Sequence, residues 1–211
     1  MRSTVSSSNG VQSALIPRLL AGDPEVPSVR IELDGTQAIG GSVAGAALLP
    51  GSFNPLHHGH LQLAEVAAGL LGCEVLFELA VFNVDKPPLT EDETLARVRQ
   101  FQNRARLLLT RAPRFLEKAR LFPGNTFVIG WDTAVRLVQP RYYGGSDAAM
   151  HAALEELCEL GARFLVAGRV NSEGRFLSLQ DTAVPGEFAD MFEAIPEHLF
   201  RADVSSTDLR R

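Results

Sequence analysis

The sequence is poor in lysine, and it has no long apolar runs. Lys86 and Lys118 are the only lysines, against eighteen arginines, and the formal net charge of the 211 residues is −5. A net negative charge argues against a broad contact with nucleic acid or with a membrane surface, although it does not exclude a local basic pocket. No stretch approaches the roughly 20 apolar residues that a membrane span needs. We therefore expect no nucleic-acid partner and no membrane partner.

Cysteine is also scarce. Cys73 and Cys158 lie 85 positions apart and form no C-x-x-C pair, so neither a zinc site nor a redox motif has support. The spacing leaves one disulfide open, but so few cysteines are typical of a reducing compartment. Residues 1–10 contain no apolar segment of the kind that a secretory signal has. We expect a cytoplasmic protein.

The chain does contain enough apolar material for a folded domain, with 45% apolar and 21% charged residues. Residues 1–45 are expected to be an N-terminal extension that is partly disordered, with a short helix at 15–20 and a strand at 28–33. Residues 46–211 are expected to form the main domain, and their length suits a single one.

From residue 46 onward, apolar strands alternate with helical segments. We expect strands at 46–49, 74–82, 126–129, 163–167 and 199–204, and helices at 59–72, 91–110 and 148–160. This alternation predicts an α/β fold: a Rossmann-like, doubly wound parallel sheet of about five strands in an α/β/α sandwich. Ligands of such folds bind at the carboxyl ends of the strands, where the strand order reverses.

Three of the five histidines fall within four positions, directly after the first of these strands. Small residues at Gly51 and Ser52 allow backbone N–H groups to approach an anion, and the helix that starts near Gly59 adds unsatisfied N–H groups and a partial positive charge. His57 and His60 are three positions apart, so they can project from one side of the first helical turn. The pattern predicts a phosphate site in which two imidazoles donate hydrogen bonds to oxygens that gain charge.

Residues 51–60, GSFNPLHHGH, resemble the fingerprint G-x-F-x-P-x-H-x-G-H of the nucleotidylyltransferase superfamily at all six fixed positions. Residues 204–210, VSSTDLR, are similar to I-S-S-T-x-I-R, a second signature of that superfamily, with apolar Val and Leu in place of the two Ile. The pair of signatures is most similar to the adenylyltransferases of nicotinamide or nicotinate mononucleotide.

This resemblance implies the site residues. His57 and His60 would bind the nucleotide phosphates and stabilise the transition state. The further residues implied for nucleotide and phosphate binding are Gly51, Ser52, Phe53, Asn54, Gly59, Ser205, Ser206, Thr207 and Arg210. The candidates for acceptor binding are Lys86, Gly130, Trp131, Asp132 and Arg169.

Some of these residues have a second interpretation. Asp132 would serve equally well as a helix cap, and Asp85 could hold a metal ion or pair with Lys86. Arg97 and Arg99 are expected to lie in solvent on a helix.

The implied reaction transfers a nucleoside monophosphate, AMP from ATP, to a phosphorylated acceptor such as nicotinamide or nicotinate mononucleotide, and releases pyrophosphate. The expected partners are thus a nucleoside triphosphate and a phosphorylated small molecule. The expected cofactor is Mg²⁺ held through the phosphates, with no protein ligands predicted for it.

Three alternatives stay open: a cytidylyltransferase, an adenylyltransferase with another acceptor, and a catalytically silent nucleotide-binding protein. Because the second signature ends one residue before Arg211, we expect either that the natural C-terminus is short or that the last helix finishes against a partner subunit of a homo-oligomer.

Overall fold

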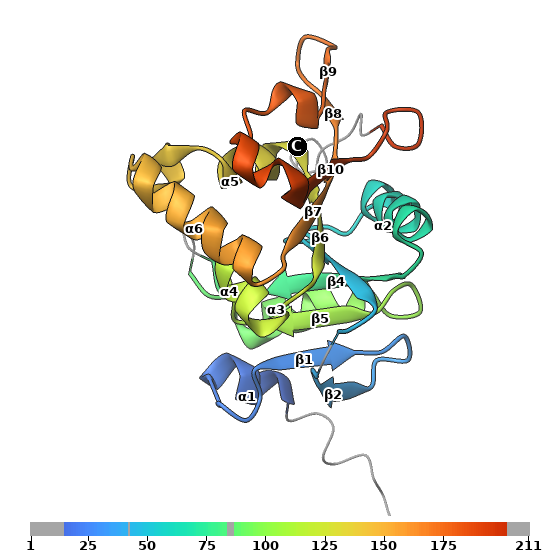
Figure 1. Ribbon diagram of the computed structural model, residues 1–211. Helices are drawn as coiled ribbons and strands as arrows, with labels where there is room; N and C mark the ends of the chain where they lie inside the picture. Colours follow the sequence, from blue (N-terminus) through green and yellow to red (C-terminus); the bar gives the residue numbers. More distant parts are fainter. Residues whose placement is uncertain (1–14, 42, 84–86, 202–211) are drawn as a thin grey trace, which may run out of the picture.

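The structure is a computed structural model that describes residues 15–41, 43–83 and 87–201 (Figure 1). Within these ranges the centre of the molecule is an eight-stranded sheet with the strand order β10-β7-β6-β3-β4-β5-β1-β2. The strands from β10 to β5 are parallel to one another, whereas β1 is antiparallel to both of its neighbours. The sheet strands are β1 Ser28–Ile31, β2 Gln37–Ile39, β3 Ala46–Pro50, β4 Glu74–Ala80, β5 Leu107–Thr110, β6 Thr126–Gly130, β7 Arg163–Ala167 and β10 Phe192–Ala194.

Helices cover both faces of this sheet. The α-helices are α1 Leu15–Ala21, α2 His58–Leu71, α3 Glu91–Arg99, α4 Phe115–Leu121, α5 Trp131–Leu137 and α6 Asp147–Glu159. A hairpin of β8 Arg169–Val170 and β9 Phe176–Leu177 and three 3₁₀ segments, η3 Pro140–Tyr143, η4 Leu179–Asp181 and η5 Gly186–Met191, complete the described chain.

Neighbouring residues of one strand point into two separate hydrophobic cores. In β3, Leu49 packs in a core that also contains side chains of α1, α2 and α3, while Leu48 packs in a second core with α4, α5 and α6. This alternation is the period of two that a strand imposes when both of its faces are covered. The predicted Rossmann-like α/β/α fold is therefore confirmed, although the sheet has more than the five strands expected.

The strand order reverses beside β3. The chain runs from β3 through β4 to β5 on one side, and then returns to β6, β7 and β10 on the other side of β3. The carboxyl ends of β3 and β6 are Pro50 and Gly130. They therefore flank the point at which α/β proteins of this type bind their ligands.

One predicted helix is wrong. The segment 91–110 was expected to be helical throughout, but α3 ends at Arg99, the chain turns with a positive φ of 57° at Asn103, and residues 107–110 form β5. All four residues of β5 are buried. A short apolar run such as Leu107-Leu-Leu109 fits a buried strand and a buried helix equally well, so periodicity alone could not separate them.

The last predicted strand, 199–204, is not found where the chain is described. Residues 199–201 form a turn and an irregular segment, and residues 202–204 lie outside the described residues. The edge strand of the sheet is β10 instead, which pairs with β7 through Phe192 and Phe164.

The short helix and the strand predicted before residue 45 are present as α1 and β1. Figure 1 shows α1, β1 and β2 together at the β5 end of the molecule. β1 pairs with β5 from Ser28↔Thr110 to Ile31↔Leu107, so these N-terminal residues extend the main sheet. The expected disorder of residues 1–14 concerns residues that lie outside the described ranges.

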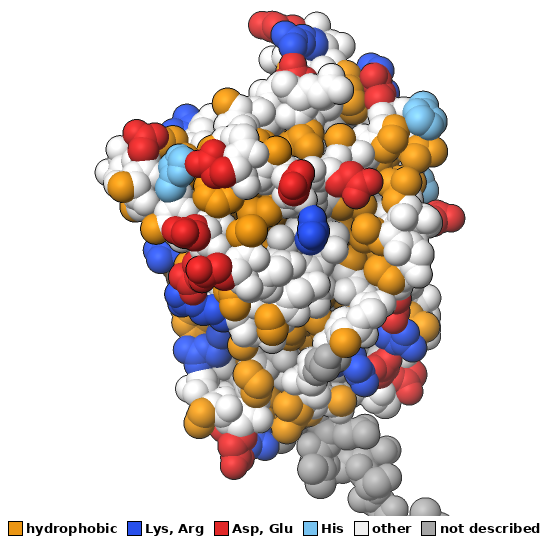
Figure 2. Space-filling view, in the orientation of Figure 1, with side chains coloured by type: hydrophobic (Ala, Val, Ile, Leu, Met, Phe, Trp, Pro, Cys, Tyr) orange, Lys and Arg blue, Asp and Glu red, His pale blue; other side chains and the backbone are white. Residues whose placement is uncertain are grey.

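The surface mixes charges of both signs. Figure 2 shows Lys and Arg side chains interspersed with Asp and Glu on the visible face. None of the described helices combines the length and the apolar character needed to cross a membrane. Cys73 and Cys158 are both free thiols, which closes the question of a disulfide between them.

Candidate functional site

The loop after β3 is held by the backbone and by one buried aromatic ring. The Gly51 N–H donates to the carbonyl oxygen of Glu78 at 2.9 Å, which continues the β3–β4 ladder by one bond. A Cβ at Gly51 would lie 2.6 Å from the Phe53 ring, so only glycine fits there. Phe53 is 1% exposed and contacts the His60 ring edge to face at 5.1 Å. The structure therefore places Phe53 in the core, as a support for His60 rather than as a surface for a base.

The structure brings His57 and His60 together. Their rings are stacked with centroids 3.7 Å apart and an interplanar angle of 26°, at the start of α2. The Nδ1 atom of His60 accepts a hydrogen bond from the backbone N–H of His57 at 3.3 Å. In the neutral ring the proton of His60 therefore sits on Nε2, which makes that atom a donor. Gly59 leaves room for the pair, since a Cβ there would lie 3.2 Å from Nδ1 of His57.

Burial keeps this pair uncharged near neutral pH. It lowers the pKa of His57, and it lowers the pKa of His60 to about 4, with the charge of His57 as a second cause. Desolvation disfavours the protonated imidazole, and two adjacent imidazolium ions would also repel each other. Both rings are thus able to donate one hydrogen bond while remaining neutral.

This shift predicts how stability depends on pH. The pKa of His60 is about 4 in the folded chain against an ordinary value of 6.5 for histidine, so the unfolded chain binds more protons between these values. The free energy of unfolding should therefore fall as pH drops from about 6.5 towards 4, and should be insensitive to His60 above that window. The free energy of unfolding, measured by urea denaturation, should fall less between pH 7 and pH 5 for His60→Asn than for the wild type. His58→Asn, which removes an exposed neighbour, is the control, and a loss in His60→Asn equal to that of the wild type would contradict the shift.

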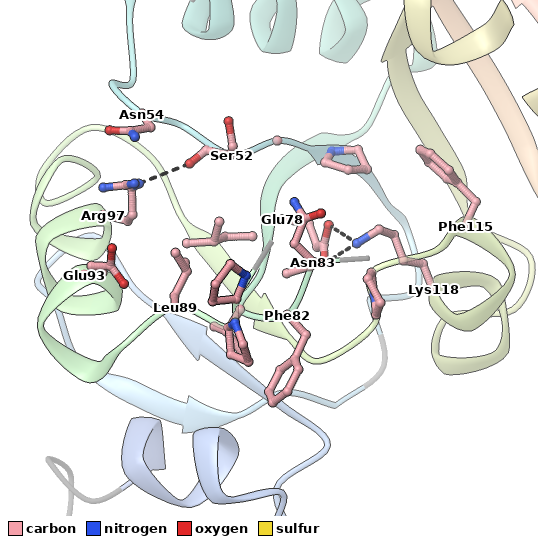
Figure 3. A pocket seen from close by; sticks show the side chains of 18 of the residues that line it. Ser52, Asn54, Glu78, Phe82, Asn83, Leu89, Glu93, Arg97, Phe115 and Lys118 are labelled. Atoms are coloured by element: carbon pink, nitrogen blue, oxygen red, sulfur yellow. Dashed lines mark hydrogen bonds and ion pairs between the residues drawn. The ribbon is translucent and has the colours of Figure 1, made fainter. Parts of the chain in front are cut away.

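A cavity of about 530 Å³ lies beside the loop, at the carboxyl ends of β3 and β4 (Figure 3). Its wall includes three residues of the loop that were predicted to bind the nucleotide, and segments that follow β4 and β5. Besides Gly51, Ser52 and Asn54, it is lined by residues that include Glu78, Phe82, Asn83, Leu89, Glu93, Arg97, Phe115, Lys118, Thr133 and Arg136. His57 and His60 do not line it, so the cavity and the histidine pair are neighbours that share the loop.

Arg97 was expected to be solvated, and the structure corrects this. It is half-buried on α3, and its Nε atom donates to the carbonyl oxygen of Ser52 at 3.3 Å. Sequence spacing could not show this, because the two residues are 45 positions apart. Arg97 thus brings a positive charge to the cavity wall next to the loop.

The cavity also reaches a buried ion pair that sequence reasoning missed. Lys118 Nζ lies 2.7 Å from both carboxylate oxygens of Glu78 and donates to the carbonyl oxygen of Ala112 at 2.6 Å. Thr110 donates its hydroxyl to Glu78 Oε1 at 2.5 Å. The Glu78 side chain is 0% exposed and that of Lys118 is 4% exposed. A signal was available, since Lys118 is one of only two lysines, but its partner is 40 positions away.

The residues predicted for the acceptor at the end of β6 form a separate group. Gly130 is the N-cap of α5, so Asp132 is not the cap, and its carboxylate pairs instead with Arg169 at 2.5 Å. The indole Nε1 of Trp131 is buried and has no hydrogen-bond partner among the described residues. None of these four residues is among those that line the cavity. The carboxylate of Asp132 already compensates the charge of Arg169.

Some predicted residues lie outside the described residues. These are Asp85 and Lys86 and the whole second signature, with Ser205, Ser206, Thr207 and Arg210. In the described part of the chain, no three His, Cys, Asp or Glu side chains are placed so that they could hold a metal ion. An ion carried by the phosphates of a nucleotide stays a prediction.

The histidine pair and the cavity lie at the carboxyl ends of the strands beside the point of strand reversal, where open α/β sheets bind their ligands. Residues 48–211 match the model of the cytidylyltransferase-like family. Since the match covers well over half of the chain, the chain belongs to that family, which indicates a nucleotidyltransferase. The family match specifies neither the nucleotide nor the acceptor. A search of curated proteins gave no match.

Proposed function

We propose that the chain transfers AMP from ATP to the phosphate of an acceptor such as nicotinamide or nicotinate mononucleotide, and releases pyrophosphate. The observation that carries this proposal is the stacked, neutral pair of His57 and His60 at the start of α2, beside the carboxyl end of β3. Uncharged imidazole N–H groups at a helix N-terminus can donate hydrogen bonds to a bound anion without carrying a positive charge themselves.

In the reaction, an oxygen of the acceptor phosphate attacks the α-phosphorus of the triphosphate. The bond from that phosphorus to the bridging oxygen breaks, and its electron pair leaves with pyrophosphate. His57 and His60 donate hydrogen bonds to the oxygens that gain charge, and no general base is needed because the attacking phosphate is already ionised. Mg²⁺ on the triphosphate, where bound, offsets the charge of its oxygens.

The position of the cavity supports a place for the acceptor. Gly51 and Ser52 line the cavity on one side and lead into the histidine turn on the other. An acceptor in the cavity would thus have its phosphate near the loop, and the nucleotide would lie over the start of α2. Arg97, hydrogen-bonded to Ser52, supplies positive charge at this junction.

A cytidylyl transfer is the second candidate, because the family that matches is described as cytidylyltransferase-like. The test is pyrophosphate release with Mg²⁺ and either ATP or CTP, each with nicotinamide mononucleotide, nicotinate mononucleotide or no acceptor. Release that requires both ATP and an acceptor is the expected result. Pyrophosphate release that requires an acceptor and occurs with CTP but not with ATP would select the second candidate. Nucleotide binding without pyrophosphate release in the presence of any acceptor would contradict transfer altogether.

A further inference from the structure

The loop between β3 and α2, which carries the proposed reaction, is hydrogen-bonded to the end of α3. Gln100 is the C-cap of that helix. Its Oε1 atom accepts a hydrogen bond from the backbone N–H of Leu56 at 2.8 Å, and its Nε2 atom donates to the carbonyl oxygen of Phe53 at 3.1 Å. Nε2 also donates to the carbonyl oxygen of Ala96, within α3, at 3.5 Å. The amide of Gln100 thus joins the helix to two points of the loop.

These contacts fix the direction of the amide group. An amide oxygen can only accept hydrogen bonds, and an amide nitrogen can only donate them. Leu56 offers a donor, while Phe53 offers an acceptor, so a rotated amide would present the wrong atom to each. A glutamate in this place would keep the acceptor and lose the donor, and a methionine would lose both.

The loop has a backbone conformation that needs such support. Phe53 has a φ of 43°, in the left-handed region, which is unfavourable for a residue with a Cβ atom and persists only where the surroundings hold it. Phe101, next to Gln100, contacts the Phe53 ring edge to face with centroids 5.1 Å apart. Figure 3 shows the further contact from Arg97 to the carbonyl oxygen of Ser52. Side chains at the end of α3 therefore hold both the backbone and the ring of the loop.

The supported residues lead directly to the histidine pair. Leu56, whose N–H Gln100 binds, immediately precedes His57. Phe53, whose carbonyl oxygen Gln100 binds, contacts the His60 ring edge to face at 5.1 Å. A shift of the loop would therefore move both imidazoles relative to a bound phosphate, and a displacement of about 1 Å can cost about 10²-fold in rate.

We propose that Gln100 is a positioning residue for the transfer reaction, and that it fixes the two histidines in their stacked arrangement by holding the backbone at Phe53 and Leu56. The inference rests on the proposed function and adds to it a residue outside both sequence signatures. Sequence spacing could not single Gln100 out, because it lies 44 and 47 positions from its two partners in the loop.

The first test replaces Gln100 with methionine, which keeps the length of the side chain and removes both hydrogen bonds to the loop. We expect kcat for pyrophosphate release to fall about tenfold or more, because the histidine donors are no longer held in place. The matched control is Gln102→Met, two residues further along the chain, where the side chain is exposed. An unchanged kcat in Gln100→Met, or an equal loss in the control, would overturn the proposal.

A double-variant cycle separates positioning from a general loss of stability. If Gln100 acts through the histidines, Gln100→Met should matter less in a His60→Ala background, because the placement of a ring that is absent no longer affects the rate. The factor by which kcat falls should be at least about threefold smaller there than in the wild-type background. The same factor in both backgrounds would overturn the proposal.

Amide hydrogen exchange, measured by NMR, gives a readout that does not depend on turnover. The N–H of His57 donates to Nδ1 of His60, so its exchange reports on the histidine turn rather than on the bonds that the substitution removes. In Gln100→Met this exchange should be about tenfold faster or more, because the turn opens locally. The N–H of Gly51, which donates to Glu78, should keep its wild-type rate. An unchanged rate at His57, or equal acceleration of both amides, would overturn the proposal.

If Gln100→Met does not fold, Gln100→Glu takes its place, since it keeps the acceptor for Leu56 and removes only the donor to Phe53. The same three measurements then decide, with losses in the same direction as the supporting result. A wild-type protein that releases no pyrophosphate with any acceptor would contradict the proposed function. The exchange of the His57 N–H would still decide whether Gln100 holds the histidine turn.

Discussion

Replacing His60 with alanine is expected to lower kcat by about 10²-fold or more, because it removes a donor placed for the oxygens that gain charge in the transition state. The Nε2–H of His60 is fixed in direction by the hydrogen bond from the backbone of His57 to Nδ1, and its ring is held by the edge of Phe53. His57→Ala should have an effect of the same order. Steady-state pyrophosphate release, with folding checked by circular dichroism, measures the loss.

His58→Ala is the matched control for this prediction. His58 lies between the two stacked rings in sequence and opens the same helix, but it is exposed. Surface substitutions of this kind change stability by no more than about 0.5 kcal/mol, and we expect kcat to stay close to that of the wild type. Normal turnover in a folded His60→Ala protein would remove the basis of the proposed function.

Replacing Lys118 with methionine is expected to lower the free energy of unfolding by about 3–5 kcal/mol, because it leaves Glu78 buried and charged without a partner. The Glu78 carboxylate would keep only the hydroxyl of Thr110, and the carbonyl oxygen of Ala112 would lose its donor. The measurement is urea denaturation near neutral pH.

Two comparisons separate this effect from loss of an ordinary ion pair. Arg120→Met on the same helix removes an exposed pair with Glu156, which should cost no more than about 1 kcal/mol. A double variant with Met at both 78 and 118 should recover much of the lost stability, since hydrophobic replacement of a whole buried pair is often close to neutral. If Lys118→Met and Arg120→Met lower the free energy of unfolding equally, burial of the Glu78–Lys118 pair does not determine the size of the loss.

A strand or helix was predictable where the sequence marks both of its ends. β3 is closed by Pro50-Gly51, and α2 ends at Gly72 in a left-handed conformation, so both were found. β5 lacks such a boundary, because residues 100–106 contain neither proline nor glycine to separate it from α3. The all-buried Leu107-Leu-Leu109 run was therefore absorbed into the helix before it.

The candidate site was predictable to the extent that its parts are close in the sequence. The turn that carries His57 and His60 is one continuous segment, so the spacing predicted that both side chains project from one side of the first helical turn, and the structure adds that their rings stack. The cavity combines segments that follow β4, β5 and β6 with that turn, and its polar contacts join residues 32 to 45 positions apart. Among the two lysines, sequence reasoning singled out Lys86, while the structure shows the buried partner of Glu78 to be Lys118.

The antiparallel addition of β1 and β2 has a consequence for how the molecule avoids self-association. Without β1, the backbone N–H and C=O groups of Leu107–Thr110 on that side would be unpaired, and this fully buried strand would be the open edge of a parallel sheet. Such borders are templates for pairing with other chains. The family match begins at residue 48, but the hydrogen bonds that shield this border come from residues 28–31. The segment before the match therefore covers the β5 edge and leaves the three-residue strand β2 as the edge strand on this side of the sheet, and a short edge strand is a poor template for pairing with another chain.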